Sequence, residues 1–298
     1  MRLLLAADSV ITTEMLVDAV AARRWPRGTR ALVLSVVEDE AIPAEVWREA
    51  GYGAEAVRQE GWRRWEQITA LTVEPLRQLG IAAEVRIMRG DLRWLITHEA
   101  EEWSADLILI RAHNRTDFRN WMLGSVARAV VRDAPCSVEV VRAVKDDLSV
   151  VGNGHMKILL ATDGSEHSRA AALAIARQPW PEGAEIKVMS MVNPVTYSME
   201  ELGLYRGGGT DRAHKAINDA ARILKEVGAR MTAEVIADRP VKRILDEAKE
   251  WGADLVVVGT RDRRGLRRLL SGSVSERVAS RAPCSVKVVR GTEHRPTL

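Results

Sequence analysis

The chain has 298 residues, of which 46% are hydrophobic, and its 44 basic and 41 acidic residues leave a net charge of +3. This length predicts two folded domains, and the mixed charge argues against a general nucleic-acid surface. Two cysteines are too few for a disulfide framework or a Cys-rich zinc site, so we expect a reducing, cytoplasmic setting. We also expect no signal peptide, because the first residues lead directly into a predicted strand, with no basic start, long apolar core and small-residue cleavage site. No membrane role is expected, because no apolar run approaches the roughly 18 residues that span a bilayer.

In chain order, MRLLLAAD predicts a buried strand that ends at Asp8, and a long helical stretch lies between Pro43 and Gly80. The polar segment KDDLSVVGNGH, residues 145–155, is the predicted linker. After it, KILLATD predicts a strand, and Ser165 is placed to cap the helix that follows. Further strands are predicted at EIKVMSMV, AEVIAD, ADLVVVGT and SVKVVR, with helices at residues 211–227, 240–251 and 273–281.

The chain repeats itself. At an offset of 148 residues, 106–142 aligns with 254–290 and 16 of the 37 positions are identical. Upstream the offset becomes 155, which aligns Trp25 with Trp180 and Asp8 with Asp163. We therefore predict a duplicated domain, with one copy at residues 1–144 and the other at 156–292.

Consecutive Val and Ile positions in the predicted strands are typical of a parallel sheet with helices on both faces. Each copy should be an α/β Rossmann-like domain of five strands. In such sheets ligands bind beyond the carboxyl ends of the strands, at the point where the strand order reverses. Asp163 and Gly259 both fall at predicted strand ends.

The second copy resembles the universal stress protein (UspA-like) family from ATDGSEHSRAAL to LLSGSVSERVASRAPCSVKVVR. The first copy is similar to it mainly in ADLILI and LGSVARAVVRDAPCSVEVVR. The resemblance is therefore to a tandem universal stress protein. It implies two domains of the adenine nucleotide alpha hydrolase-like type and a stress-response regulatory module without defined catalysis.

Nucleotide-binding members of that family are similar in having a glycine, two residues, a second glycine, nine residues and then Gly-Ser or Gly-Thr. Gly259 and Gly272 match this spacing, but the second glycine is Asp262. Glycines let backbone N–H groups approach phosphate, and a helix start favours an anion. By resemblance, ATP with magnesium would be the cofactor, with adenine and ribose near Ala161, Asp163 and Val192. Its phosphates would lie among Gly259, Arg261, Asp262, Gly272, Ser273, Val274 and Ser275.

Asp262 opposes this assignment, since a carboxylate beside a polyanion costs about 1 to 3 kcal/mol if unscreened. The neighbouring arginines, or a divalent ion that bridges carboxylate and phosphate, would offset the charge. In the first copy Arg111 and Asn114 replace the glycines, and only Gly124-Ser125 is kept. We predict that this copy binds no ATP and that the Arg111 side chain fills the phosphate space.

The competing hypothesis is a protein that binds no nucleotide and acts through an unknown protein partner. Trp47, Trp62 and Trp65 on the long helical stretch would then form the contact surface, although core packing explains them equally well. A weak ATPase is a third hypothesis by fold analogy alone. No catalytic constellation and no metal site is predicted, because the six histidines are scattered.

The remaining expectations concern buried side chains and assembly. Cys136 and Cys284 should be buried small side chains, and Trp103 and Trp251, which are repeat equivalents, should be structural. By resemblance to similar proteins, which dimerise through their last strands, SVEVVR and SVKVVR should pair so that the domains form an intramolecular pseudo-dimer. We also expect two chains to form a homodimer.

Overall fold

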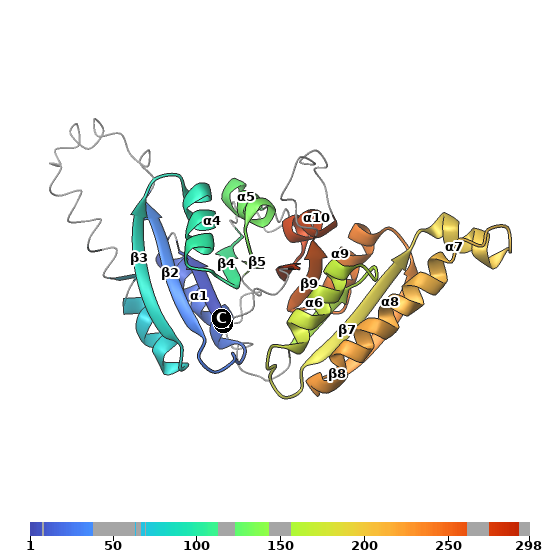
Figure 1. The fold of residues 1–298 in the computed structure, drawn as a ribbon, viewed down its shortest axis with the longest axis horizontal. Coiled ribbons are helices and arrows are strands. Elements are labelled where there is room, and N and C mark those ends of the chain that lie inside the picture. The colour runs from blue at the N-terminus through green and yellow to red at the C-terminus, as the bar shows by residue number, and fades with distance from the viewer. Residues whose placement is uncertain are drawn as a thin grey trace.

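The computed structural model describes residues 1–7, 9–37, 63, 67–68, 70–112, 123–142, 156–260 and 274–291. Their strands form one ten-stranded sheet in the order β3-β2-β1-β4-β5-β10-β9-β6-β7-β8. Helices cover both faces of this sheet, and the two halves of the chain lie side by side (Figure 1). The predicted linker, residues 145–155, lies outside the described residues.

The N-terminal half supplies one end of the sheet. Residues 70–78 are helical, in the stretch expected to be a helix between Pro43 and Gly80. The other elements in this half are β1 (Arg2–Ala6), α1 (Val10–Ala21), β2 (Arg30–Val37), β3 (Ala82–Arg89), α4 (Leu92–Glu102), β4 (Leu107–Arg111), α5 (Ser125–Asp133) and β5 (Ser137–Val141).

The C-terminal half repeats this order, and a short helix, α7 (Pro194–Glu201), follows its second strand. Its elements are β6 (Lys157–Ala161), α6 (Glu166–Ala176), β7 (Glu185–Val192), α7 (Pro194–Glu201), α8 (Gly209–Leu224), η2 (Lys225–Val227), β8 (Arg230–Ala237), α9 (Pro240–Glu250), β9 (Leu255–Thr260), α10 (Val274–Arg281) and β10 (Ser285–Arg290). Sequence analysis missed α7, which begins at a proline after the capping residue Asn193.

Within each half the strands are parallel and the described topology is the same. The prediction of two five-stranded Rossmann-like α/β domains is confirmed. The last strands, β5 and β10, are the pair expected to join the halves, and they are hydrogen-bonded antiparallel. Their register sets Val140 opposite Val286, Glu139 opposite Lys287 and Val138 opposite Val288.

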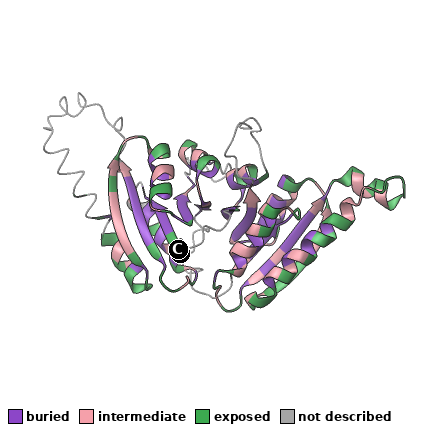
Figure 2. Cartoon of the chain, viewed as in Figure 1, coloured by how far each residue is buried: buried purple, intermediate pink, exposed green. Residues whose placement is uncertain are grey.

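The buried side chains are distributed differently on the two faces of the sheet. On the face covered by α4, α5, α9 and α10, one hydrophobic cluster runs through both halves and includes Val138 and Val286. On the face covered by α1 and α6, each half has a cluster of its own. Figure 2 shows the buried residues concentrated in the central strands.

Several repeat-equivalent contacts show that the two halves keep the same local structure. The indole Nε1 of Trp25 donates to the Val20 carbonyl at 2.8 Å, and Trp180 donates to Ile175 at the same distance. Trp103 and Trp251 pack half-buried against the shared cluster, which confirms their structural role.

Both cysteines are free and buried, as predicted. Burial raises the pKa of each thiol to about 12. Trp47, Trp62 and Trp65 lie outside the described residues. None of the helices in the described ranges has the length and apolarity needed to cross a bilayer.

Candidate functional site

The candidate site lies in the C-terminal half, at the carboxyl ends of β6, β7 and β9. The chain leaves β6 toward β7 and β8, and then returns to the other side of β6 as β9. The strand order therefore reverses between β6 and β9, where open parallel sheets place their ligands. Ala161 pairs with Val258 on one side and Met189 on the other. Ala161 and Val192 are both buried.

The loop after β6 is held by short-range hydrogen bonds. The Ser165 backbone N donates to Asp163 Oδ1 at 3.0 Å, and the Gly164 N donates to Thr162 Oγ1 at 3.3 Å. Ser165 caps α6 as predicted, because its Oγ accepts from the Ser168 N at 3.3 Å. The loop thus fixes the Asp163 carboxylate in front of the helix.

Asp163 carries the exposed charge of this loop. Desolvation raises the pKa of its carboxyl, but hydrogen bonds from Ser165 and Ser168 outweigh that effect, and the net pKa lies below the ordinary value. The group is therefore a carboxylate at neutral pH. It can accept hydrogen bonds from hydroxyl groups such as those of a ribose.

Gly164 has a structural requirement of its own. Its φ is +76°, and a Cβ at this position would lie 3.1 Å from the Ala216 Cβ on α8. A side chain here would strain the backbone and push the loop away from α8. The first copy has no glycine after Asp8.

Gly259, the first glycine of the phosphate pattern, is also explained by packing. A Cβ built on it would lie 2.2 Å from the His167 carbonyl oxygen and 2.6 Å from the Ser168 N. Both are backbone atoms in the first turn of α6. Gly259 therefore lets α6 approach the end of β9, a role that sequence reasoning did not identify.

A hydroxyl pair links the end of β9 to the start of α10. Ser275 Oγ donates to Thr260 Oγ1 at 3.1 Å, and Ser275 is buried. Val274, beside it, is 41% exposed. Sequence analysis did not identify Thr260 as a site residue. Its hydroxyl, directly after Gly259, is the signal that could have indicated it. The rest of the expected phosphate site, Arg261, Asp262, Gly272 and Ser273, lies outside the described residues.

The end of β7 borders a second anchored segment that sequence analysis also missed. The Glu200 carboxylate on α7 accepts from the backbone N–H groups of Gly209 and Thr210, at 2.6 and 2.9 Å. Hydrogen bonds, chiefly from the Thr210 hydroxyl, lower the pKa of Glu200. This contact attaches α7 to the first turn of α8, and a Cβ on Gly209 would lie 3.5 Å from Val192 Cγ1. The segment therefore forms one wall beside Val192.

The same edge of the N-terminal half contains a guanidinium. Arg111 occupies the position equivalent to Gly259, and its Nη1 lies 3.4 Å from Thr12 Oγ1 in the first turn of α1. Its Nε is buried and has no acceptor among the described residues. Ser9 caps α1, and Gly124 precedes α5. Asp8 and Asn114 lie outside the described residues.

Within the described ranges, no cluster of three His, Cys, Asp or Glu side chains forms a metal site. Of the predicted site residues, the fold brings Ala161, Asp163, Val192 and Gly259 to one edge of the sheet. The start of α10, with Val274 and Ser275, is joined to that edge through Thr260.

Comparison with known proteins identifies the same duplication. The family model described as "Universal stress protein family" matches residues 1–142 and again 155–290. A universal stress protein of Methanocaldococcus jannaschii is 30% identical over 153 residues, which cover 48% of this chain and 88% of that protein. One from Thermus aquaticus is 34% identical over 134 residues, covering 45% of this chain and 97% of its own length.

The fold is matched along the whole chain by a solved structure. The crystal structure of a universal stress protein from Archaeoglobus fulgidus aligns over 98% of both chains with a TM-score of 0.69, at 20% sequence identity. At this identity the likeness concerns the fold alone. The two single-domain relatives each correspond to about half of this chain.

Proposed function

Since this chain belongs to the universal stress protein family, we propose that it is a stress-response regulatory module that binds an adenine nucleotide in its C-terminal domain alone. ATP with magnesium is the proposed ligand. The observation that carries the proposal is the carboxylate of Asp163, held in front of α6 at the point where the strand order reverses.

The described residues fit the adenosine part of such a ligand. Asp163 offers an ionised acceptor, while the buried ends of β6 and β7, at Ala161 and Val192, offer backbone groups and an apolar wall. The phosphates would extend toward Thr260 and the start of α10, where a helix N-terminus favours an anion. Because Gly259 is packed against α6, the residues that follow it would make the contacts with the phosphates.

Restriction to one domain is supported by Arg111. Its guanidinium lies against the first turn of α1, where the C-terminal domain has only a glycine hydrogen. The loop of the N-terminal domain also lacks the counterpart of Gly164. Both differences reduce the room for a ligand at that edge.

Isothermal titration calorimetry of the full chain with ATP and magnesium tests the proposal, with Asp163→Ala and its repeat equivalent Asp8→Ala as matched variants. We expect one ATP per chain and a loss of roughly tenfold to a hundredfold in affinity for Asp163→Ala, the scale of a hydrogen bond to a charged group. Asp8→Ala should bind as the parent does. No heat at high micromolar protein, or equal losses in the two variants, would refute the proposal.

A second candidate is a protein that binds partners and no nucleotide. It is favoured by the packing explanation of Gly259, because that glycine then needs no ligand to account for it. Mass spectrometry of the purified native protein separates the two, since a co-purified adenine nucleotide would count against this candidate.

The proposal also includes a cytoplasmic location, a homodimer and domains that span residues 1–144 and 156–292. Light scattering of the purified chain tests the homodimer. Limited proteolysis tests the domain limits, since cleavage should fall within residues 145–155.

A further inference from the structure

Four buried polar side chains lie where the two domains meet on the α1 and α6 face of the sheet. Glu139 on β5 is opposite Lys287 on β10 in the antiparallel register. The exposed fractions are 0% for Glu139, 4% for Lys287, 6% for Arg23 and 5% for Gln178. This set separates the two hydrophobic clusters of that face.

Glu139 and Lys287 each contact a residue that follows a helix of their own domain. Arg23, just after α1, forms an ion pair with Glu139. Lys287 Nζ donates to Gln178 Oε1, just after α6, at 3.2 Å. Glu139 and Lys287 are repeat equivalents at the offset of 148, and Arg23 and Gln178 are equivalents at 155. The two domains therefore differ in charge at both positions.

The register gives these differences a consequence for pairing. Because Glu139 faces its own repeat equivalent, the pseudo-twofold relation between the domains passes through this pair. Any two domains joined by the same contact would set this position opposite itself. Two N-terminal domains would oppose Glu to Glu, and two C-terminal domains would oppose Lys to Lys. Only a mixed pair opposes unlike charges.

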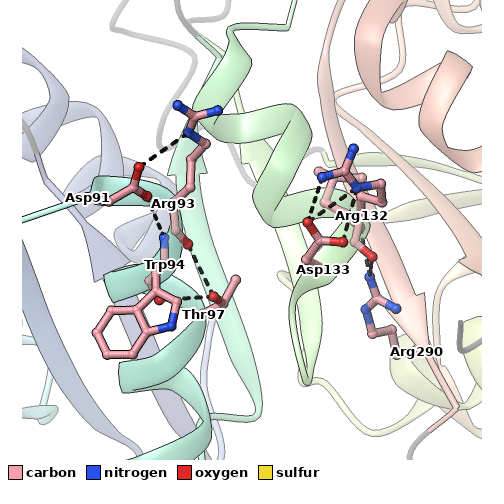
Figure 3. A network of polar contacts seen from close by, with 8 residues as sticks. Asp91, Arg93, Trp94, Thr97, Arg132, Asp133 and Arg290 are labelled. Atoms are coloured by element: carbon pink, nitrogen blue, oxygen red, sulfur yellow. Dashed lines mark hydrogen bonds and ion pairs between the residues drawn. The ribbon is translucent and has the colours of Figure 1, made fainter. Parts of the chain in front are cut away.

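The arginine contacts on either side of this pair do not distinguish the domains. Arg142 donates to the carbonyls of Ala279 and Cys284, the former at the end of α10. Its equivalent Arg290 donates to the carbonyls of Val131 and Arg132 at the end of α5, both at 2.8 Å (Figure 3). These reciprocal contacts use backbone acceptors and an arginine that both domains possess. They would form equally well between two like domains.

The buried set is also incompletely hydrogen-bonded. Glu139 Oε2, Arg23 Nη1 and Gln178 Nε2 have no partner among the residues that the structure describes. Buried ion pairs are weak sources of stability compared with apolar side chains of similar size, whereas a like-charged buried pair is strongly disfavoured. Selectivity of pairing therefore accounts for this set better than stability does.

We propose that Glu139 and Lys287 make the β5–β10 surface selective for an unlike domain. The N-terminal domain pairs there with a C-terminal domain and not with a second N-terminal domain. The C-terminal domain likewise pairs with an N-terminal domain and not with a second C-terminal domain. The preference is independent of any nucleotide.

The first test measures which domains pair after the predicted linker between them is cut. A protease site placed within residues 145–155 is cleaved in the full protein, and the two halves are unfolded, refolded together and weighed by native mass spectrometry. We expect mixed pairs to exceed like pairs by on the order of 100-fold, from like-charge costs of several kcal/mol. The uncut chain, refolded in the same way, controls for refolding.

The matched variant makes the two domains identical at the four positions. Arg23→Gln, Glu139→Gln and Lys287→Gln together leave glutamine at each of them, and this variant should form mixed and like pairs in nearly statistical proportions. Wild-type halves that form like pairs freely or do not pair, or an equalised variant that keeps the wild-type preference, would overturn the proposal.

A second test uses the intact chain and needs no cutting. Lys287→Glu opposes two carboxylates and should lower the thermal midpoint. The full exchange, Arg23→Gln, Glu139→Lys, Gln178→Arg and Lys287→Glu, moves the whole set across the contact and should restore most of the midpoint. Failure of the exchange to recover more than the single variant would contradict a charge-based preference.

Discussion

Replacement of Gly259 by alanine separates the packing role of this residue from a role in ligand binding. The new Cβ would lie 2.2 Å from the His167 carbonyl oxygen and 2.3 Å from its carbon, whereas ordinary contacts begin at 3.4 Å. The end of β9 and the first turn of α6 must therefore separate by roughly 1 Å or more, and both are backbone. Overpacking costs about 1 to 3 kcal/mol, and we expect the upper end of this range.

For a chain of this size, about 3 kcal/mol corresponds to a fall of roughly 6 to 12 °C in the thermal midpoint, measured by scanning calorimetry. Gly291→Ala is the matched control, because its Cβ would meet nothing nearer than His167 Nδ1 at 3.8 Å. That variant should melt within about 2 °C of the parent. Equal midpoints for the two variants would show that α6 does not depend on Gly259, and a loss of ATP affinity alone would return the residue to the ligand site.

Three further predictions concern buried groups. Burial lowers the pKa of Lys287 from 10.5 to about 8, so between these pH values the unfolded chain holds more protons than the folded chain and the free energy of unfolding should rise with pH. In urea unfolding the rise should reach about 3 kcal/mol relative to Lys287→Gln, and parallel pH profiles of the two proteins would contradict this. Arg142→Met should cost about 1 to 3 kcal/mol in the same assay, because the carbonyls it reaches lose a buried donor; an unchanged midpoint would contradict it. Cys136 and Cys284, with thiol pKa values raised to about 12 by burial, should react with a chromogenic disulfide only after denaturation, and rapid labelling of the folded chain would disprove their burial.

The fold could be predicted because its signals are local and repeated. Consecutive Val and Ile residues indicated buried parallel strands, and the internal repeat indicated the same topology twice. The pairing of β5 with β10 was predicted from the family resemblance, since similar proteins dimerise through their last strands. Helix α7 was missed because Asn193 and Pro194 are typical of turns as well as of helix starts.

The candidate site was less accessible to sequence reasoning. Asp163 and Val192 could be placed because strand ends in a parallel sheet share an edge. The reason for Gly259 could not, since it depends on how closely α6 approaches β9, and Gly164 depends likewise on α8. The Glu and Lys in SVEVVR and SVKVVR were visible in the sequence, but nothing local indicates that they face each other.

The two proposals are connected by what happens to a duplicated domain. A symmetric pair would contain two equivalent edges, but one edge has the Arg111 guanidinium beside α1, whereas the other has Gly259 packed against α6. Such specialisation is preserved only if every pair contains one domain of each kind. Tethering favours that outcome within one chain, yet domains can exchange between chains, and a tether does not prevent like domains from meeting. Opposite charges at Glu139 and Lys287 disfavour it, because a like pair sets Glu opposite Glu or Lys opposite Lys at the centre of the contact. We infer that charge divergence at the pairing strand and the replacement of a glycine by Arg111 act together, so that each assembled pair contains the single C-terminal site that we propose.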